Sequence, residues 1–571
     1  MRPQRSYTYG HTSGVMLGET IGECLERIAA RFPQHDAVVS VEQDRRMSYS
    51  ELMVAVDRAA RALLSINVRR GDRVALWSVN TIEWVVLQYA TARVGAILVN
   101  INPAYRTHEL AFALRASRSK VLFMTESFKQ SRFVEMFLEI CPEAYAEEDS
   151  SIRSDSFPDL KTAVVFSEHA HGGVMTFDDF LSCSADVSND TLREAIEQLD
   201  IDDIINIQYT SGTTGTPKGV QLTHNNILNN GMMAGERMHL TCDDRICVPV
   251  PFYHCFGMVV SNLSAMTHGA AIIIPSRVFD AEATLSAVEK ERCTTLHGVP
   301  TMFIAELNHP NFADTDVSTL RTGIMAGAPC PVELMRRVIT ELHMPDILIG
   351  YGMTEASPIT TMTDSNDPFG RRVETVGTVM PCQELKIIDP ESGLTVPRGT
   401  RGEICFRGYN VMVGYDHELD ATHDAIDESG WLHSGDIGDM DEDGYVRISG
   451  RIKDMVIRGG ENIYPREIEE FLHTLPEISD VYVVGIPDEK YGEELCACVK
   501  LMTPKSGLNA EDLRSACHGR IAHFKIPKYW IIVDEYPTTV TGKIQKFKLR
   551  DMAIAQLRLL ENHQAVRQRI A

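Results

Sequence analysis

A loop rich in glycine and hydroxyl side chains, residues 209–220 (YTSGTTGTPKGV), is the segment best suited to chemistry. Its backbone amides, hydroxyls and single cation, Lys218, can surround a polyphosphate without a helix dipole. The preceding residues 204–209 are apolar enough for a strand, and a short strand, VQL, is expected before a helix begins near Thr223. The composition therefore predicts a phosphate-binding loop between two strands.

This loop differs from the two best-known nucleotide-binding patterns. A Walker loop, GxxxxGK[ST], runs directly into a helix, whereas Lys218 is preceded by Pro217 and followed by Gly219. A dinucleotide GxGxxG is absent as well. By composition alone the loop is equally compatible with a surface turn. A hydrolase that uses Ser211 is a further alternative, but the GxSxG elbow is missing.

Three further segments carry groups that suit nucleotide chemistry. Glu355, in GYGMTEASP, could bind Mg²⁺, which takes few carboxylates and completes its shell with phosphate oxygens and water. Asp436, in WLHSGD, could accept hydrogen bonds from two ribose hydroxyls. Arg451, in GRIKD, carries a permanent charge and donates in a fork. Taken singly, Glu355 has the usual properties of an exposed acid, Asp436 is better explained as a turn residue, and Arg451 can be a surface arginine.

Together these segments resemble, in order, the signature motifs of the adenylate-forming (AMP-binding) enzymes: acyl-CoA synthetases, peptide-synthetase adenylation domains and firefly-type luciferases. The resemblance implies that Tyr351 stacks on adenine, that Thr354 and Glu355 contact phosphate and Mg²⁺, and that Asp436 and Arg451 contact the ribose. It also implies an ATP-binding set that comprises Thr210, Ser211, Gly212, Thr213, Thr214, Gly215, Thr216, Pro217 and Lys218 in the loop, with Gly327, Ala328 and Pro329 beside the adenine.

The C-terminal segment TGKIQK places Lys543 where this family keeps its adenylation lysine. Attack of a carboxylate on the α-phosphate builds negative charge, which a cation offsets. The surrounding lysines and Arg550 could equally form a solvated basic face. The family often has a lysine soon after the proline of this motif, whereas here Thr538 follows Pro537.

Other segments indicate the branch of the family. PFYHCFG, residues 251–257, has no acid for a substrate ammonium; His254 resembles the aromatic gate of acyl- and aryl-CoA synthetases, although a packed core histidine is the alternative. RGGENIYP resembles the segment that lines the CoA tunnel, through Arg458, Gly459 and Gly460. Lys453 falls at the family's hinge position. The whole-chain pattern, including TIGECLERIAARFP and LVNINPAYRTHEL, looks most like the medium-chain branch of fatty acyl-CoA synthetases.

The expected function is that of an ATP-dependent fatty acid:CoA ligase, an AMP-forming acid–thiol ligase. Carboxylate and Mg-ATP give acyl-AMP and pyrophosphate, and CoA then gives acyl-CoA and AMP. Medium- to long-chain fatty acids are the expected substrates, because the regions expected to line the acyl pocket are apolar. The alternatives are an aryl- or short sulfur-containing acid:CoA ligase, a non-catalytic nucleotide-binding protein and a firefly-type oxygenase.

The elements that must position these residues follow an α/β pattern. Helical and strand patterns alternate from about residue 20 to 381, which favours helix-covered, mostly parallel sheets. Short antiparallel strands then suggest a small β-barrel-like section, and a small α+β domain follows. The expected domains are an N-terminal AMP- and acyl-binding domain at 1–450, a hinge at 451–453 and a mobile C-terminal domain at 454–571, which carries Lys543.

Composition excludes several classes of function. The formal net charge of -24 over 571 residues argues against nucleic acid as a partner, since backbone binding needs a basic face. The uncharged run 246–276 reads as a core helix and a buried strand, so no transmembrane segment is expected. The 13 cysteines lack CxxC spacing and suit free thiols in the cytoplasm. The N-terminus faintly resembles a transit peptide without its apolar face, and a homo-oligomer is left open.

Overall fold

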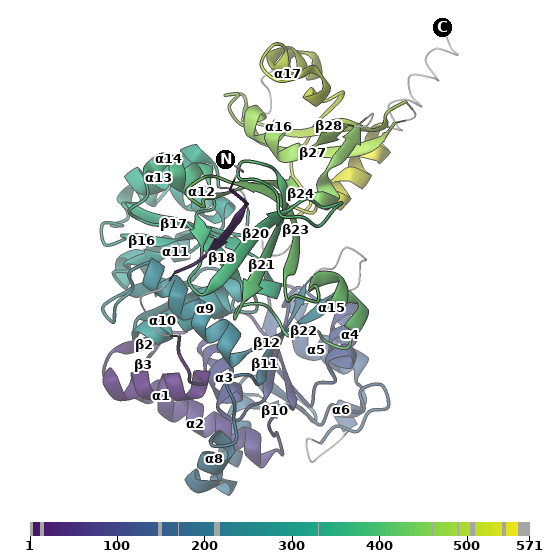
Figure 1. Ribbon diagram of the computed structural model, residues 1–571. Coiled ribbons are helices and arrows are strands. Elements are labelled where there is room, and N and C mark those ends of the chain that lie inside the picture. The colour runs from purple at the N-terminus through teal and green to yellow at the C-terminus, as the bar shows by residue number, and fades with distance from the viewer. Residues whose placement is uncertain are drawn as a thin grey trace. The chain divides into compact units, whose positions relative to one another are not determined.

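The computed structural model describes residues 4–11, 16–146, 151–169, 171–210, 217–328, 330–458, 461–488, 490–502, 509–538 and 544–557 (Figure 1). Internal contacts divide the chain into two units. The larger unit comprises Thr8–Leu385 and Phe406–His433, and the smaller comprises Met1–Tyr7, Lys386–Cys405 and Ser434–Ala571.

An eight-stranded, mostly parallel sheet lies in the larger unit. Its strand order is β10-β9-β6-β4-β5-β11-β12-β22, and only the β11–β12 and β12–β22 pairs are antiparallel. The central strands read RVALW, ILVNI and VLFMT, continuous apolar runs that are typical of strands covered on both faces. The strands are β4 (Arg73–Trp77), β5 (Ile97–Ile101), β6 (Val121–Thr125), β9 (Thr162–Phe166), β10 (Met175–Thr176), β11 (Ile204–Thr210), β12 (Lys218–Thr223) and β22 (Gly414–Tyr415).

A nine-stranded sheet forms the second layer of this unit, in the order β19-β18-β17-β16-β15-β13-β14-β2-β3. The pairs from β17 to β2 are parallel, and the edge strands run antiparallel. The strands are β2 (Asp36–Ser40), β3 (Arg45–Ser48), β13 (Arg245–Cys247), β14 (Ala271–Ile274), β15 (Thr295–Leu296), β16 (Thr322–Ala326), β17 (Asp346–Gly352), β18 (Ile359–Met362) and β19 (Thr378–Val379).

Helices cover these sheets, and the principal core joins α1–α3 with the helices that follow β12 (Figure 1). α3 is buried along its whole length, whereas α1 and α2 are amphipathic and begin with capping boxes at Thr20 and Ser48. The helices of the larger unit are α1 (Ile21–Arg31), α2 (Tyr49–Ser65), α3 (Ile82–Arg93), α4 (Thr107–Ser117), α5 (Phe133–Ile140), α6 (Glu143–Ala146), α7 (Phe177–Ser182), η1 (Cys183–Asp186), α8 (Asn189–Ile196), α9 (His224–Arg237), η2 (Phe256–Leu263), α10 (Ser264–His268), α11 (Ala281–Lys290), α12 (Pro300–Leu307), η3 (Phe312–Asp314), α13 (Val332–Glu341), η4 (Thr354–Ala356), α14 (Phe369–Glu374) and α15 (Leu419–Ala425).

The described residues form three further sheets. A five-stranded sheet has the order β1-β20-β21-β23-β24, a second five-stranded sheet holds β25–β29, and β7 (Ser127–Phe128) pairs with β8 (Ser131–Arg132). The strands are β1 (Tyr7–Tyr9), β20 (Gln383–Ile388), β21 (Gly402–Gly408), β23 (Leu432–Met440), β24 (Val446–Arg451), β25 (Val456–Arg458), β26 (Glu461–Ile463), β27 (Ile478–Asp488), β28 (Gly492–Leu501) and β29 (Tyr529–Ile532). The helices here are η5 (Ile452–Asp454), α16 (Pro465–Leu472), α17 (Ala510–Cys517) and η6 (His523–Lys525).

The α/β class and the mostly parallel sheets expected from sequence are confirmed. The barrel-like section needs correction, because the strand order from β1 to β24 is open and leaves two edge strands. The uncharged run 246–276 contains η2, α10 and the buried strand β14, as expected of a core segment. No helix among the described residues is long and apolar enough to cross a membrane. All 13 cysteines are among the described residues, and none of them forms a disulfide.

Candidate nucleotide-binding site

The phosphate-loop candidate joins two antiparallel strands of the larger unit. β11 pairs with β12, with Thr210 and Lys218 as Cα partners at the end where the loop leaves the sheet. The helix α9 begins only after β12, where the Thr223 side chain accepts a hydrogen bond from the Asn226 amide. The strand expected after the loop is therefore present. Thr210, Pro217 and Lys218 are described, and Ser211, Gly212, Thr213, Thr214, Gly215 and Thr216 lie outside the described residues.

Glu355 lies on η4, in the connection that follows β17. Thr354 and Glu355 are both buried, and the Glu355 carbonyl accepts a hydrogen bond of 2.9 Å from the Met412 amide. Gly352 is required just before this turn, because a Cβ there would lie 1.8 Å from the Pro358 carbonyl oxygen. The segment GYGMTEASP thus forms a tight bend that holds a buried carboxylate.

A tyrosine that the sequence reasoning missed lies between the two charged candidates. The Tyr415 hydroxyl donates a 2.9 Å hydrogen bond to Glu355 Oε1. The Lys218 ammonium lies 4.8 Å from the centroid of the Tyr415 ring, within cation–π distance. The pKa of Tyr415 is raised above its ordinary value by burial and by the Glu355 carboxylate. The sequence signal was a single aromatic residue in the segment VGYD, which carries no distinctive pattern.

The predicted adenine-binding segments lie at the ends of neighbouring parallel strands. β16 and β17 pair through Ala326 and Gly350, so Gly327 and Tyr351 both follow the carboxyl end of this pair. Gly327 has a φ of +84°, which a residue with a side chain rarely adopts. The rings of Tyr351 and Phe406 are 6.0 Å apart. Ligands of open α/β sheets bind at such carboxyl ends. Ala328 is exposed, and Pro329 lies outside the described residues.

His254 lies in the turn before η2. Its Nδ1 accepts a 3.2 Å hydrogen bond from the Phe256 amide, and its carbonyl accepts one of 2.9 Å from the Met258 amide. The following Gly257 has no room for a side chain, because a Cβ would lie 2.3 Å from the Pro251 carbonyl oxygen. His254 is half-buried, in contrast to the fully buried His297. His254 is therefore more exposed than His297, and its role as a gate stays a prediction.

The predicted ribose-binding pair lies in the smaller unit. Asp436 on β23 and Arg451 on β24 are Cα partners, and Arg451 Nε lies 3.1 Å from Asp436 Oδ1. The Ser434 hydroxyl donates to the Ile404 carbonyl and accepts from the Asp436 amide, at 2.6 and 3.0 Å. Gly435, between them, has a φ of +70°. The WLHSGD motif therefore forms a local bend that orients Asp436.

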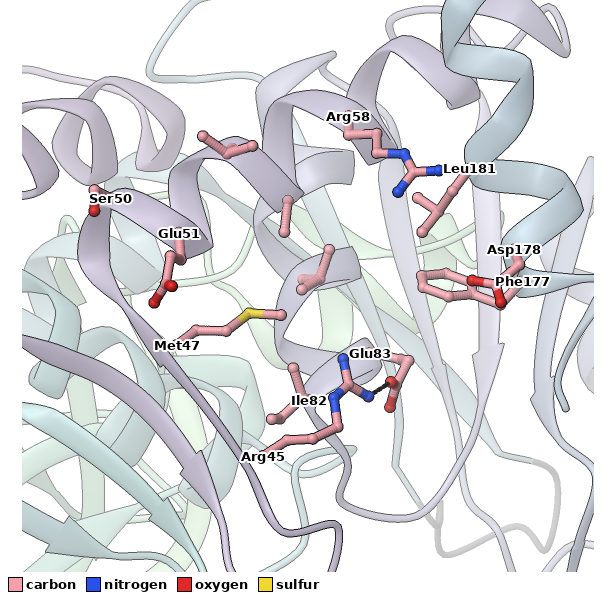
Figure 2. A pocket seen from close by; sticks show the side chains of 13 residues that line it. Arg45, Met47, Ser50, Glu51, Arg58, Ile82, Glu83, Phe177, Asp178 and Leu181 are labelled. Carbon is pink, nitrogen blue, oxygen red and sulfur yellow. Dashed lines mark hydrogen bonds and ion pairs between the residues drawn. The ribbon is translucent and has the colours of Figure 1, made fainter. Parts of the chain in front are cut away.

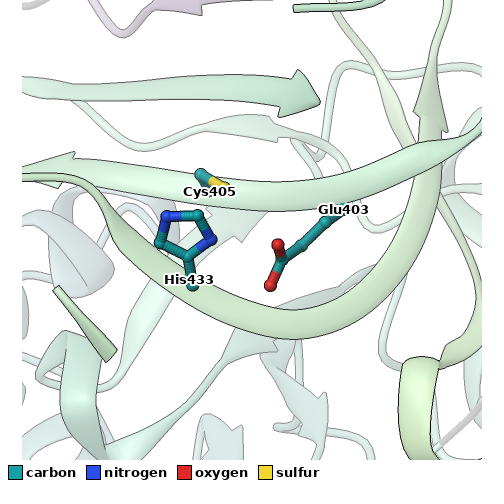
Figure 3. A group of neighbouring side chains, drawn as sticks. All are labelled: Glu403, Cys405 and His433. Atoms are coloured by element: carbon teal, nitrogen blue, oxygen red, sulfur yellow. The ribbon is translucent and has the colours of Figure 1, made fainter. Parts of the chain in front are cut away.

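A buried carboxylate supports the same bend. The Gly435 amide donates a 3.1 Å hydrogen bond to Glu403 Oε1 on β21. Figure 3 shows Glu403 and Cys405 on that strand, together with His433, which belongs to the larger unit. Glu403 and Cys405 alone are fewer ligands than a metal centre needs. We therefore assign Glu403 a structural contact with the ribose-site bend.

The predicted hinge and tunnel residues follow β24 in the smaller unit. Lys453 lies on the short helix η5. Arg458, at the end of β25, forms a 2.8 Å ion pair with the buried Glu494, and its guanidinium lies 4.6 Å from the Tyr491 ring centroid. These contacts orient Arg458 within its own unit. Gly459, Gly460 and Lys543 lie outside the described residues.

A surface pocket of about 510 Å³ lies elsewhere on the larger unit, between α2, α3 and α7 (Figure 2). Its walls include Met47, Ile82 and Phe177, and Arg45 forms an ion pair with Glu83 at its edge. None of the described site candidates lines it. The site predicted from the motifs at Lys218, Tyr351 and Glu355 therefore does not coincide with this pocket.

Comparison with known proteins identifies the family. Residues 25–416 match the AMP-binding enzyme family, and residues 467–543 match the AMP-binding enzyme C-terminal domain. A Bacillus subtilis protein named as an acyl-CoA synthetase is 48% identical over 95% of this chain and 99% of its own. The mitochondrial medium-chain acyl-CoA ligase ACSF2 of Bos taurus is 43% identical over 97% of this chain and 91% of its own.

Solved structures agree with these relatives. ATP-bound MatB from Rhodopseudomonas palustris superposes with a TM-score of 0.79 at 28% identity, covering 93% of this chain and 98% of its own. The fatty acyl CoA synthetase of Mycobacterium tuberculosis gives a TM-score of 0.70 at 29% identity, covering 94% and 99%. The expectation of an AMP-forming acid–thiol ligase is thereby confirmed. The chain belongs to the AMP-binding enzyme family.

Proposed function

We propose that this acid–thiol ligase converts a medium- to long-chain fatty acid, ATP and CoA into fatty acyl-CoA, AMP and pyrophosphate. In the first step a carboxylate oxygen attacks the α-phosphorus, the bond from that phosphorus to the bridging oxygen breaks, and pyrophosphate leaves. In the second step the CoA thiolate attacks the acyl carbonyl, and AMP leaves with the electrons of the acyl–oxygen bond.

The observation that carries this proposal is that Lys218 and Glu355 both contact Tyr415. Within one unit, this arrangement offers a cation for phosphate oxygens and a buried carboxylate for a metal ion. Carboxylate oxygen is the kind of ligand that Mg²⁺ takes, and Mg²⁺ needs few carboxylates because phosphates and water complete its shell. Glu355 would therefore hold Mg²⁺, which when bound neutralises charge on the phosphates.

The remaining candidates take the roles that the family resemblance implies. Tyr351 stacks on adenine, Asp436 accepts from the ribose hydroxyls, and Arg451 donates to the ribose and phosphates. Lys543 stabilises the charge that builds during adenylation. On this proposal, residues 451–453 form the hinge between an N-terminal domain at 1–450 and a mobile C-terminal domain at 454–571. Rotation about Lys453 then withdraws Lys543 and presents Arg458, Gly459 and Gly460 to CoA.

The fatty-acid specificity rests on the apolar segments expected to surround the acyl chain. Phe303 and Met325 are fully buried, and Val299 and Ala326 are nearly so. The Tyr253 hydroxyl is buried without a hydrogen-bond partner among the described residues. The medium-chain ligase activity named for the Bos taurus relative suits such surroundings. His254 is the proposed gate beside this region.

A carboxylate panel tests the proposal. Purified enzyme is incubated with Mg-ATP and acids from acetate to palmitate, with benzoates as the aryl comparison, and pyrophosphate and acyl-CoA are measured with and without CoA. We expect medium- and long-chain acids to release pyrophosphate and, with CoA, to yield one acyl-CoA for each pyrophosphate. Faster turnover of benzoates than of every fatty acid would contradict the fatty-acid assignment. Absence of pyrophosphate release with all acids would contradict the reaction itself.

A further inference from the structure

We propose that Tyr415 is a positioning residue that holds Lys218 and Glu355 apart, so that one is free for phosphate and the other for Mg²⁺. This inference rests on the roles proposed above for those two residues. Tyr415 uses a different part of its side chain for each neighbour. The ring face attracts the Lys218 ammonium at 4.8 Å from its centroid, and the hydroxyl donates to Glu355 Oε1 at 2.9 Å.

Lys218 and Glu355 carry opposite charges and both contact Tyr415. Without the tyrosine between them, the two side chains would attract each other. A direct ion pair between Lys218 and Glu355 would occupy the ammonium hydrogens and the carboxylate oxygens that the nucleotide and its metal ion need. No ion pair joins these two residues, both of which are described. The aromatic ring gives the ammonium a neutral partner, and the phenol takes one carboxylate oxygen. Both charges therefore keep binding capacity.

The backbone around Tyr415 is bonded to the segments that carry both charged residues. β22 pairs with β12, with Tyr415 opposite Val220, and the Asp416 amide donates a 2.7 Å hydrogen bond to the Gly219 carbonyl. On the other side, the Met412 amide donates 2.9 Å to the Glu355 carbonyl. Residues 412–416 therefore connect the end of the phosphate loop to the metal-binding turn through main-chain hydrogen bonds.

Asp416 fixes this connection to the sheet. Its buried carboxylate forms a 2.9 Å ion pair with Arg73 on β4 and accepts a 2.7 Å hydrogen bond from Gln221 on β12. The Tyr415 amide in turn donates 2.9 Å to the Thr422 hydroxyl. Because the Asp416 carboxylate and the Tyr415 amide are both held by these contacts, the backbone from which the Tyr415 side chain extends is fixed in position.

Two substitutions separate the two contacts. Tyr415→Phe keeps the ring beside Lys218 and removes the hydroxyl from Glu355, whereas Tyr415→Leu removes both. In the phenylalanine variant we expect Glu355 to lose its orientation, so the Mg²⁺ concentration that half-saturates ATP binding rises about tenfold. In the leucine variant Lys218 can reach Glu355, so ATP binding without Mg²⁺ also weakens about tenfold.

Calorimetric titration of ATP, with and without Mg²⁺ and in the absence of any carboxylate, measures both quantities without turnover. Tyr409→Phe is the matched control, because Tyr409 lies in the segment between β21 and β22 and its hydroxyl contacts Met233 and Gln383 instead. We expect that variant to bind ATP and Mg²⁺ as the unaltered protein does. Thermal unfolding establishes that each variant is folded, and if the leucine variant is not, the phenylalanine variant decides alone.

An unchanged Mg²⁺ requirement in Tyr415→Phe would overturn the inference, as would an equal effect of Tyr409→Phe. Those results leave the proposed function standing as long as the unaltered protein binds Mg-ATP. If the unaltered protein itself failed to bind Mg-ATP, the proposed function would fall, and the inference with it. A rise in the Mg²⁺ requirement confined to the Tyr415 variants supports the positioning role.

Discussion

Arg451 Nε lies 3.1 Å from Asp436 Oδ1, yet the two side chains differ sharply in exposure, at 68% for Arg451 and 9% for Asp436. The buried carboxylate is fixed by the strand pair, and the guanidinium projects into solvent. Such a pair contributes about 0–1 kcal/mol to stability, because water screens the exposed partner. Most of the arginine side chain is therefore exposed to solvent.

Arg451→Ala should impair nucleotide chemistry without destabilising the fold. Loss of a charge-assisted contact to the nucleotide should lower kcat/KM for adenylation about 10- to 100-fold, while the melting temperature changes little. Pyrophosphate release and thermal unfolding measure the two effects. Arg447→Ala is the matched control, since Arg447 lies on the same strand and pairs with Asp439 at 3.5 Å. Equal losses of activity in both variants would rule out a specific role for Arg451.

Lys543→Ala should separate the two half-reactions. The lysine is proposed to offset charge at the α-phosphate, so adenylation should fall by about 100-fold or more. Thioester formation from supplied acyl-AMP and CoA should stay within about twofold of normal, because that step no longer involves the phosphate chain. Quenched assays of each half-reaction measure the division. Lys548→Ala is the control, because Lys548 belongs to the same basic stretch as Lys543 and has no proposed role in adenylation. Equal loss in both halves would contradict this assignment.

Glu306 should limit stability at high pH. It is fully buried on α12, and both carboxylate oxygens lack hydrogen-bond partners among the described residues. Burial raises its pKa well above the ordinary value of 4.5, so the folded protein keeps it protonated where the unfolded chain ionises. Its contribution to stability is complete below pH 4.5 and is lost as the pH rises toward the folded pKa.

Glu306→Met should therefore raise the free energy of unfolding by about 1–3 kcal/mol more at pH 8 than at pH 5, because it removes the unpaired buried group. Urea unfolding at the two pH values measures the difference. Glu333→Met, at an exposed position on α13, controls for the added methionine. A gain that did not depend on pH would argue against a protonated Glu306.

His224 should have the opposite pH dependence. It is buried, its Nδ1 accepts from the Ile21 amide at 3.2 Å, and burial lowers its pKa from 6.5 to about 4. The unfolded chain therefore binds a proton that the folded protein excludes. Stability should be complete above pH 6.5 and fall by about 3 kcal/mol as the pH drops toward 4.

The test of this dependence is His224→Asn, which keeps an acceptor near the Nδ1 position and removes the titrating ring. Its unfolding free energy should vary less between pH 7 and pH 4 than that of the unaltered protein. His343→Asn, at an exposed position, provides the control. The same acid sensitivity in His224→Asn as in the unaltered protein would exclude His224 as its source.

The sequence predicted elements best where local pattern decides the structure. The strand expected at residues 204–209 is β11, which extends one residue further, and the helix expected to begin near Thr223 is α9, which Thr223 caps. The section predicted to be barrel-like is an open sheet in the structure, because short alternating strands do not specify whether a sheet's edges meet. Local pattern cannot reveal such long-range pairing.

The candidate site was predicted unevenly for the same reason. Asp436 and Arg451 were recognised separately from motifs, and the strand pair that joins them came from the structure. Tyr415 was missed, because its contacts with Lys218 and Glu355 join segments far apart in the sequence. The assignments of Lys543, the hinge and the CoA tunnel remain predictions, as does the cytoplasmic setting.

The most direct test of the central claim follows the carboxylate oxygen. Decanoate labelled with heavy oxygen in its carboxylate is converted with Mg-ATP and CoA, and the products are analysed by mass spectrometry. Attack on the α-phosphorus predicts that one labelled oxygen appears in AMP and none in pyrophosphate. Labelled inorganic phosphate together with ADP would show attack on the γ-phosphorus and would contradict the account.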